Sequence, residues 1–190
     1  MTEQFIKPSM HHVTLKTTKL QEMIDWYQKT VGIEVIYQFP GGAWLSNDLA
    51  NHRLGLLAFP DYHEKGKHEK HTGMHHTAFE YESFDGLFKS YARMRGIGIV
   101  PQFCLNHGMT TSMYYADPDG NLVELQSDNF GDWTKSTEYM RSSPVFAANP
   151  IGIFFDPDRV LEAHRAGQPF QTIHEGIMAE KFLPDVIPAV

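Results

Sequence analysis

Three residues of this 190-residue chain have the types and spacing to hold a metal ion together. His12 and His76 each begin a run that predicts a strand, and they lie 64 positions apart. Glu124 lies on a third predicted strand, on its polar face beside apolar neighbours. A buried carboxylate is costly without a partner, and a divalent cation supplies one. Two histidines and one carboxylate, with the remaining coordination positions free, suit an open Fe(II) site for oxygen chemistry.

The two histidines belong to an internal repeat. Each copy predicts a strand that begins with His, then an amphipathic helix, then a glycine stop. A repeated unit of this kind does not bury its apolar face alone, so we expect the two copies to pack together and bring the histidines into one site. The neighbouring His11 and His75 are expected to point to the opposite face as structural or exposed residues. The matched pairs are His12 and His76, Leu20 and Phe84, Ile24 and Phe88, Tyr27 and Tyr91, and Gly32 and Gly96.

Each copy continues into three more strands, which predicts an α+β fold of two βαβββ modules at about residues 9–60 and 74–128. In the second module we expect a strand at 97–103 and then a hairpin around Asp117-Pro118-Asp119-Gly120, a type I turn sequence. The polar insert at 61–73 is expected to be a solvated loop. The prediction is one domain, 1–128.

Residues 129–190 have no counterpart in the repeat and form a C-terminal extension. One helix is predicted at 157–166, with Asp156 as its cap, and a strand at 149–155. The extension is too apolar to be plainly disordered, so we expect it to pack on the domain or on a partner subunit. If its Phe and Ile side chains close the cavity, the substrate should be hydrophobic; simple packing away from the cavity is the equal alternative.

Bulk composition narrows the classes of function. The net charge of −7 argues against nucleic acid or an anionic membrane as the partner. One cysteine excludes an internal disulfide framework and fits a reducing compartment. No apolar run is long enough to span a bilayer, and no secretory signal is apparent, so a cytoplasmic location is expected.

The segments HHVTL, MHHTAFEY and YYADPDGNLVELQ resemble the vicinal oxygen chelate superfamily, and the likeness covers roughly residues 9–128. The resemblance implies that the two modules form one cup-shaped mixed β-sheet around a metal ion. It also implies that His12, His76 and Glu124 are the three metal ligands.

Within that superfamily the chain looks most like the type I extradiol ring-cleavage dioxygenases, in their small one-domain branch. The segment NHRLGLLAFP at 51–60 resembles the family strand that carries the catalytic acid–base histidine, here His52. Tyr114 matches the family's second catalytic residue, ten positions before Glu124. His107 is the candidate for the histidine that contacts the substrate, although its spacing from Tyr114 is shorter than the family pattern.

The resemblance therefore implies Fe(II), or Mn(II) with the same ligands, together with O2 and a catechol as reactants. A biaryl catechol such as 2,3-dihydroxybiphenyl would suit a cavity closed by the apolar extension. A homo-oligomer is also expected.

Three other readings remain open. A glyoxalase-like isomerase needs a fourth protein ligand, and the strand at 53–59 offers no carboxylate. A thiol-transfer metalloenzyme can use the same three ligands but does not need His52. A non-enzymatic small-molecule-sequestering protein generally lacks the three ligands. Iron content separates the binding protein from the enzymes, and O2 uptake with a catechol separates the dioxygenase from the other enzymes.

Overall fold

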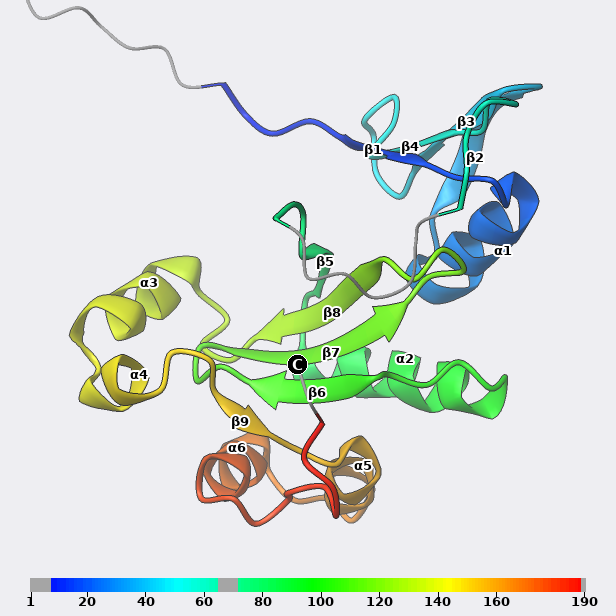
Figure 1. Cartoon of the computed structure of the whole chain (residues 1–190). Helices are drawn as coiled ribbons and strands as arrows, with labels where there is room; N and C mark the ends of the chain where they lie inside the picture. The colour runs from blue at the N-terminus through cyan, green and yellow to red at the C-terminus, as the bar shows by residue number, and fades with distance from the viewer. Residues whose placement is uncertain (1–7, 65–71, 189–190) are drawn as a thin grey trace, which may run out of the picture. The chain divides into compact units, whose positions relative to one another are not determined.

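The computed structural model describes residues 8–64 and 72–188 (Figure 1). The chain divides into two compact units. Unit 1 holds the residues up to 71 together with the turn Asp117–Asp119, and unit 2 holds the remainder. Part of the polar insert at 61–73 lies outside the described residues. Among the helices that are described, none is long and apolar enough to cross a membrane.

Unit 1 is one βαβββ module. Its elements are β1 (Val13–Lys16), α1 (Leu20–Val31), β2 (Glu34–Phe39), β3 (Gly42–Ser46) and β4 (Leu54–Leu57). The sheet has the order β1-β4-β3-β2, in which β1 pairs parallel to β4 and the other pairs are antiparallel. Helix α1 buries Met23, Ile24 and Tyr27 and ends at Gly32, whose left-handed φ of 70° favours glycine.

Unit 2 repeats this topology and extends it. Its module comprises β5 (His76–Tyr81), α2 (Phe84–Gly96), β6 (Phe103–Asn106), β7 (Thr110–Ala116) and β8 (Leu122–Asp128). The order β5-β8-β7-β6 matches that of unit 1, and a fifth strand, β9 (Ile153–Phe154), adds to β6 from the C-terminal extension. The α+β class and the two βαβββ modules are therefore confirmed, as two mixed sheets rather than a closed barrel. The joining of both sheets into one cup, and the single domain 1–128, stay predictions.

One predicted strand is displaced along the sequence. The strand expected at 97–103 begins only at Phe103 and runs to Asn106. Gly98 has a left-handed φ of 81°, and Pro101 has no backbone N–H to give to a sheet ladder. The chain therefore reaches the sheet as a loop, and only Gln102 joins it early, by donating its N–H to the carbonyl of Tyr114 at 2.7 Å.

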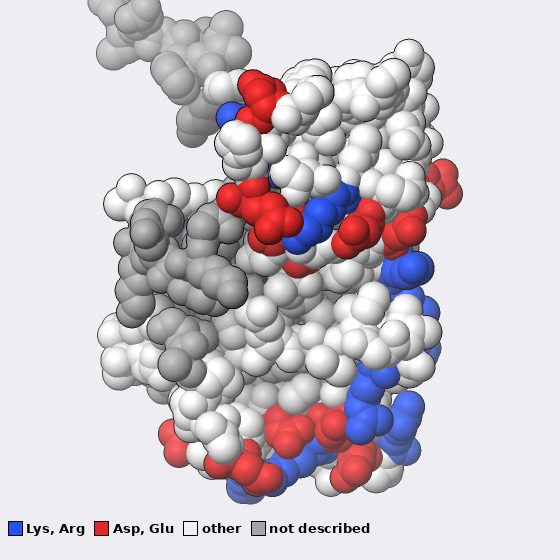
Figure 2. All heavy atoms as spheres, turned by 45° about the vertical axis from the view of Figure 1, so that its right-hand side comes forward, with Lys and Arg blue, Asp and Glu red and all other residues white. Residues whose placement is uncertain are grey.

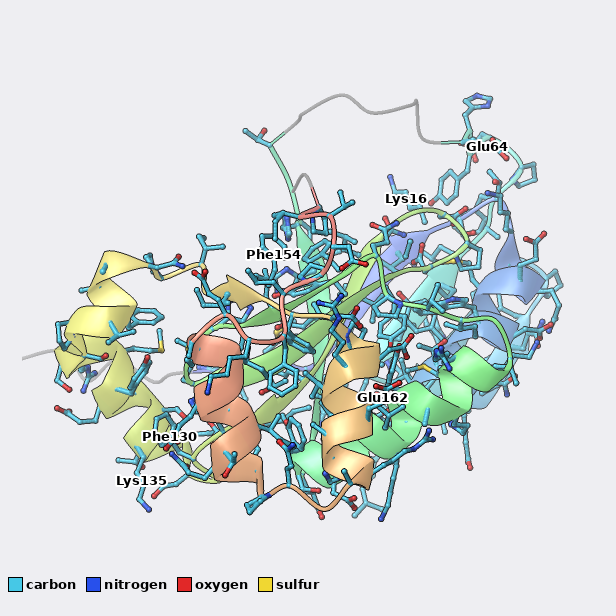
Figure 3. The ribbon with its side chains drawn as sticks, turned by 90° about the horizontal axis from the view of Figure 1, so that it is seen from below. Lys16, Glu64, Phe130, Lys135, Phe154 and Glu162 are labelled. Carbon is cyan, nitrogen blue, oxygen red and sulfur yellow. The ribbon has the colours of Figure 1, made fainter. Side chains whose placement is uncertain are left out.

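The extension forms four helices where the sequence predicted one. Helix α5 (Pro157–Arg165) is the predicted one, and Asp156 caps it as expected by accepting from the N–H groups of its first turn. The other three are α3 (Trp133–Ser142), α4 (Pro144–Ala148) and α6 (Phe170–Met178). Figure 3 shows α5 and α6 side by side under the strands of unit 2.

The extension is part of the core of unit 2. Phe155, Val160, Ile173 and Ile177 are buried. Tyr91 of α2 donates a hydrogen bond to Asp158 at 2.7 Å, which ties α2 to α5.

Acidic and basic side chains lie interspersed on the face drawn in Figure 2, and both signs occur along its lower edge.

Candidate functional site

Strand pairing in unit 2 gathers three of the candidate residues on one face of the sheet. Tyr114 of β7 lies directly opposite Glu124 of β8, and His76 begins the parallel strand on the other side of β8. His76 Nε2 lies 3.1 Å from Glu124 Oε2, and the Tyr114 hydroxyl donates to Glu124 Oε1 at 3.0 Å. Only 6% of Glu124 and 4% of Tyr114 are exposed. The buried carboxylate is thus held between a histidine and a phenol.

His107 completes this group from the turn between β6 and β7. Its Nε2 lies 3.0 Å from the Tyr114 hydroxyl, and its Nδ1 donates to the carbonyl of Ile151 at 2.6 Å. Because a carbonyl only accepts, Nδ1 carries the proton, and in the neutral ring Nε2 is left as an acceptor facing Tyr114. His107 thus lies beside Tyr114 and is supported by the extension, and its contact with the substrate stays a prediction.

The turn that carries His107 is anchored by a buried amide. Asn106 is fully buried; its Oδ1 accepts from the N–H of Gly108 at 2.8 Å and its amide nitrogen donates to Thr111 at 3.1 Å. The same nitrogen lies 3.2 Å from Nδ1 of His174 on α6. Satisfied buried polar groups of this kind favour a single arrangement of the turn.

Burial sets the protonation of the two residues behind Glu124. The pKa of Tyr114 is raised far above its usual value, first by burial and then by the negative charge of Glu124. The pKa of His107 is lowered, chiefly by burial, which outweighs the opposing charge of Glu124. Tyr114 therefore stays a hydroxyl donor near neutral pH, and His107 stays neutral.

Unit 1 brings together the other two candidates. The rings of His12 and His52 lie 4.3 Å apart between centroids, and His52 also lies 5.2 Å from Trp44. His11 joins them, so that one nitrogen of each of the three histidines lies within 4.8 Å of the others. The pKa of His52 is lowered by partial burial and by its neighbours His12 and His11.

Sequence reasoning missed the place of His11 beside His12. Alternation predicted opposite faces, but β1 begins only at Val13, so both histidines precede the pleated strand. The sequence predicted His11 to be either structural or exposed, and it is exposed. The six candidates thus form two groups: His12 and His52 in unit 1, and His76, His107, Tyr114 and Glu124 in unit 2. Convergence of His12, His76 and Glu124 on one ion stays a prediction.

A cavity of about 470 Å³ opens above the unit 2 group. Besides the four candidates, it is lined by the sheet residues Glu80, Thr110, Gln126 and Asp128, by Met109 of the β6–β7 turn, and by Trp133, Ser136, Thr137 and Met140 of α3. The α3 residues follow the i, i+3, i+4, i+7 spacing of one helix face. That spacing, preceded by Asp132 as cap, is the signal in the sequence that could have found them.

Comparison with known proteins identifies the family of this chain. The Glyoxalase/Bleomycin resistance protein/Dioxygenase superfamily matches residues 9–125. The chain is 37% identical to biphenyl-2,3-diol 1,2-dioxygenase 2 of Rhodococcus globerulus over 179 residues, which cover 94% of this chain and 93% of that protein. Biphenyl-2,3-diol 1,2-dioxygenase 3 of the same organism is 37% identical over 164 residues, covering 86% of each chain.

The solved structure of lactoylglutathione lyase from Agrobacterium tumefaciens matches with a TM-score of 0.50 and 17% identity, over 64% of this chain and 94% of that one. Identity that low shows the fold alone. The likeness to dioxygenases read from the sequence motifs is confirmed by the two Rhodococcus relatives, and the likeness extends through the C-terminal extension. The chain therefore belongs to the glyoxalase/bleomycin resistance protein/dioxygenase superfamily.

Proposed function

We propose that this protein is a non-haem Fe(II)-dependent extradiol dioxygenase, which uses O2 to open the ring of a catechol beside its two hydroxyl groups. The observation that supports this best is the buried contact chain from His76 through Glu124 and Tyr114 to His107 at the base of a cavity. The two relatives that bear dioxygenase names, at 37% identity, favour this chemistry over isomerase or thiol-transfer chemistry.

The donor atoms of unit 2 fit a first-row divalent ion. Ligand atoms bound at roughly 2.0–2.2 Å to one ion lie about 3 Å apart, and His76 Nε2 and Glu124 Oε2 are separated by 3.1 Å. We propose that His12 is the third ligand. When bound, Fe(II) would supply open coordination positions and a redox centre for the reactants. Mn(II) accepts the same ligands.

The residues around the ligands would handle protons and orient the substrate. Tyr114, kept protonated by burial, would turn its single hydroxyl proton from Glu124 to a substrate oxygen when the substrate binds. His107, fixed by Ile151 with its Nε2 as an acceptor, would receive a hydrogen bond from a substrate hydroxyl. His52, whose lowered pKa favours the neutral ring, would accept a proton from the catechol and return it later.

We propose a hydrophobic substrate, and specifically a biaryl catechol. The cavity of about 470 Å³ falls within the range of ligand pockets, roughly 300–1,000 Å³. It extends beyond the four candidate residues to Trp133, Met109 and Met140, which leaves room for a second ring next to the diol. The names of the two relatives point the same way.

We also propose that the chain forms a homo-oligomer. Strand β2 is an edge of the unit 1 sheet, and its Ile36 and Tyr37 are exposed. Exposed apolar groups on a sheet edge favour pairing with another chain. Light scattering on a sizing column measures the subunit number, and replacement of Ile36 by Lys should lower it. A monomer in the unaltered protein would contradict the proposal.

The function is tested by purifying the protein under argon, loading it with Fe(II) and adding O2 with a panel of catechols in an oxygen electrode. The expected result is one O2 consumed per catechol, with the yellow absorbance of a ring-opened product, and the highest kcat/KM for a biaryl catechol. Stoichiometric iron with no O2 uptake on any catechol would reject the proposed function.

A further inference from the structure

The cavity of unit 2 has two chemically different ends. Its inner end holds the candidate ligand pair His76 and Glu124 with Tyr114, whereas its outer end lies against α3. The strand register shows that the two ends lie at different positions along the sheet. Glu80 on β5 pairs with Gln126 on β8, and this pair lies two residues further along both strands than the pair Ala78 and Glu124. A substrate whose diol reaches the inner end therefore places its substituent against α3 and these sheet residues.

Helix α3 is fixed to the sheet from several sides. The indole N–H of Trp133 donates to Glu80 Oε1 at 3.0 Å. Ser136 donates to the carboxylate of Asp128, at the end of β8. Gly108 leaves room for Tyr139, because a Cβ there would lie 2.4 Å from the tyrosine oxygen. The start of the helix, near Phe130 and Lys135, is labelled in Figure 3. A helix held in this way is a rigid wall rather than a loose cover.

The wall presents apolar surface to the cavity. Trp133 is 72% exposed and Met140 46% exposed, although both line the cavity. Large exposed apolar side chains that converge on one hollow mark a binding site. An indole face and a thioether pack favourably on an aromatic ring, so the outer end offers an uncharged aryl group a surface to cover.

The same end carries negative charge only. Glu80 and Asp128 both line it, and no Lys or Arg is found among the cavity-lining residues in the described part of the chain. Their hydrogen bonds come from neutral donors, namely Trp133 for Glu80 and a serine and two backbone N–H groups for Asp128. Neutral donors leave the two negative charges in place, and an anionic substituent entering this end meets repulsion.

We propose that the outer end of the cavity is a charge filter: α3 attracts an uncharged aryl substituent, and Glu80 with Asp128 rejects catechols that carry a carboxylate on the substituent. Trp133, Met140 and Glu80 are thus specificity-determining residues. This inference rests on the proposed function. It adds residues to the proposed site, and all of them except Glu80 lie beyond residues 9–125, the segment that matches the superfamily.

The test uses a pair of substrates that differ only in charge, 3-(2,3-dihydroxyphenyl)propanoate and its methyl ester. The native protein should give a kcat/KM several-fold higher for the ester, since Glu80 is exposed and solvent screens part of its repulsion. Glu80→Gln keeps an acceptor for the Trp133 indole and removes the charge, so most of this preference should be lost. Glu138→Gln, which alters an exposed carboxylate of α3 that does not line the cavity, should leave the preference unchanged. An unchanged preference in Glu80→Gln would overturn the proposal.

A second variant tests the apolar wall. Trp133→Ala should lower kcat/KM for 2,3-dihydroxybiphenyl by about tenfold more than kcat/KM for unsubstituted catechol, the worth of one aromatic contact. Equal losses on both substrates would show a structural role and would overturn this part of the proposal.

Binding measurements show whether the charge-filter proposal or the proposed function is wrong. Calorimetry under argon, with the protein as purified, measures affinity for the acid and the ester without turnover. If no catechol is cleaved but the ester binds more tightly and Glu80→Gln narrows the difference, the filter stands and the dioxygenase proposal falls. If catechols are cleaved and the acid binds as tightly as the ester, the filter falls alone.

Discussion

The two units carry the same βαβββ topology, yet their shares of the candidate site differ in how they are held. In unit 2, Glu124 and Tyr114 are buried and bonded to each other, and His107 is bonded to the extension. In unit 1, the contacts found for His12 among the described residues are with two other histidines, His11 and His52. His12 is exposed, whereas its counterpart His76 is half-buried beside Glu124.

The difference shows what a repeated module supplies and what it does not. The module fixes where a candidate histidine sits at the start of its first strand, since His12 directly precedes β1 and His76 begins β5. It does not supply the groups that orient the side chain. In unit 2 those groups are Tyr114 and Glu124 on β7 and β8, and the Ile151 carbonyl of the extension, so the unit 2 candidates are preorganised.

The largest effect is expected from removing a ligand. His76→Ala, Glu124→Gln and His12→Ala should each lose bound iron and lower turnover by more than the roughly 100-fold that a supporting residue is worth. Iron content by colorimetric assay, together with O2 uptake, measures this. His11→Ala and His75→Ala are the matched controls and should retain iron. If His12→Ala kept its iron and His11→Ala lost it, the ligand from unit 1 would be His11 rather than His12.

Removing the proton carrier should come next. His52→Ala is expected to keep a full complement of iron and to lower kcat by roughly 10²–10⁴-fold, the usual worth of a general acid–base group. Single-turnover kinetics on the iron-loaded variant checks this. Turnover close to that of the native protein would reject the role, and loss of iron would make His52 a ligand.

A smaller effect is expected in the preorganised half. Tyr114→Phe keeps the ring, which stacks on Phe103 with centroids 4.5 Å apart, and removes the hydroxyl that donates to Glu124. A hydrogen bond to a charged group is worth roughly 1.5–3 kcal/mol, so kcat/KM should fall by about 10–150-fold with iron retained. A decrease in kcat/KM of less than about twofold would show that the hydroxyl only donates a hydrogen bond to Glu124 and takes no part in turnover.

The smallest effect should come from the extension itself, and two glycines with similar backbone angles isolate it. Gly152 and Gly167 have φ values of 98° and 80°, so alanine at either costs roughly 1–2 kcal/mol of conformational strain. At Gly152 the new Cβ would also lie 2.2 Å from the carbonyl of Asn106, whereas Gly167 has open space. Gly152→Ala should therefore lose more stability in urea than Gly167→Ala and alone raise KM. Equal effects would show that docking of the extension does not support His107.

Much of the fold and part of the site could be predicted from local patterns. The helical stripes, the glycine stops and the DPDG hairpin predicted both modules because each is a short-range feature. Strand alternation placed Glu124 on the polar face, where the structure buries it next to His76. Alternation failed at His11 because β1 begins only at Val13, so that both His11 and His12 lie before the pleat is established.

The parts that could not be predicted depend on distant contacts. Helix α3 is ten residues long and lies in the extension, where the sequence predicts a helix only at 157–166. The bond that positions His107 joins residues 44 positions apart and uses a main-chain carbonyl, which leaves no signature in the sequence. Neither periodicity nor residue type reports such a contact.

Because His107 bonds to the main-chain carbonyl of Ile151, the type of mutation in this segment decides its effect. Ile151 is 61% exposed, and its bond with His107 is made by the backbone carbonyl alone. A substitution there changes the exposed group and leaves the acceptor in place, so Ile151→Ala should be silent in an alanine scan. Insertions or deletions between α4 and β9 would instead shift the acceptor along the chain. The orientation of His107 is therefore inherited through the length of this segment and through Gly152, whereas the side chain at position 151 can vary.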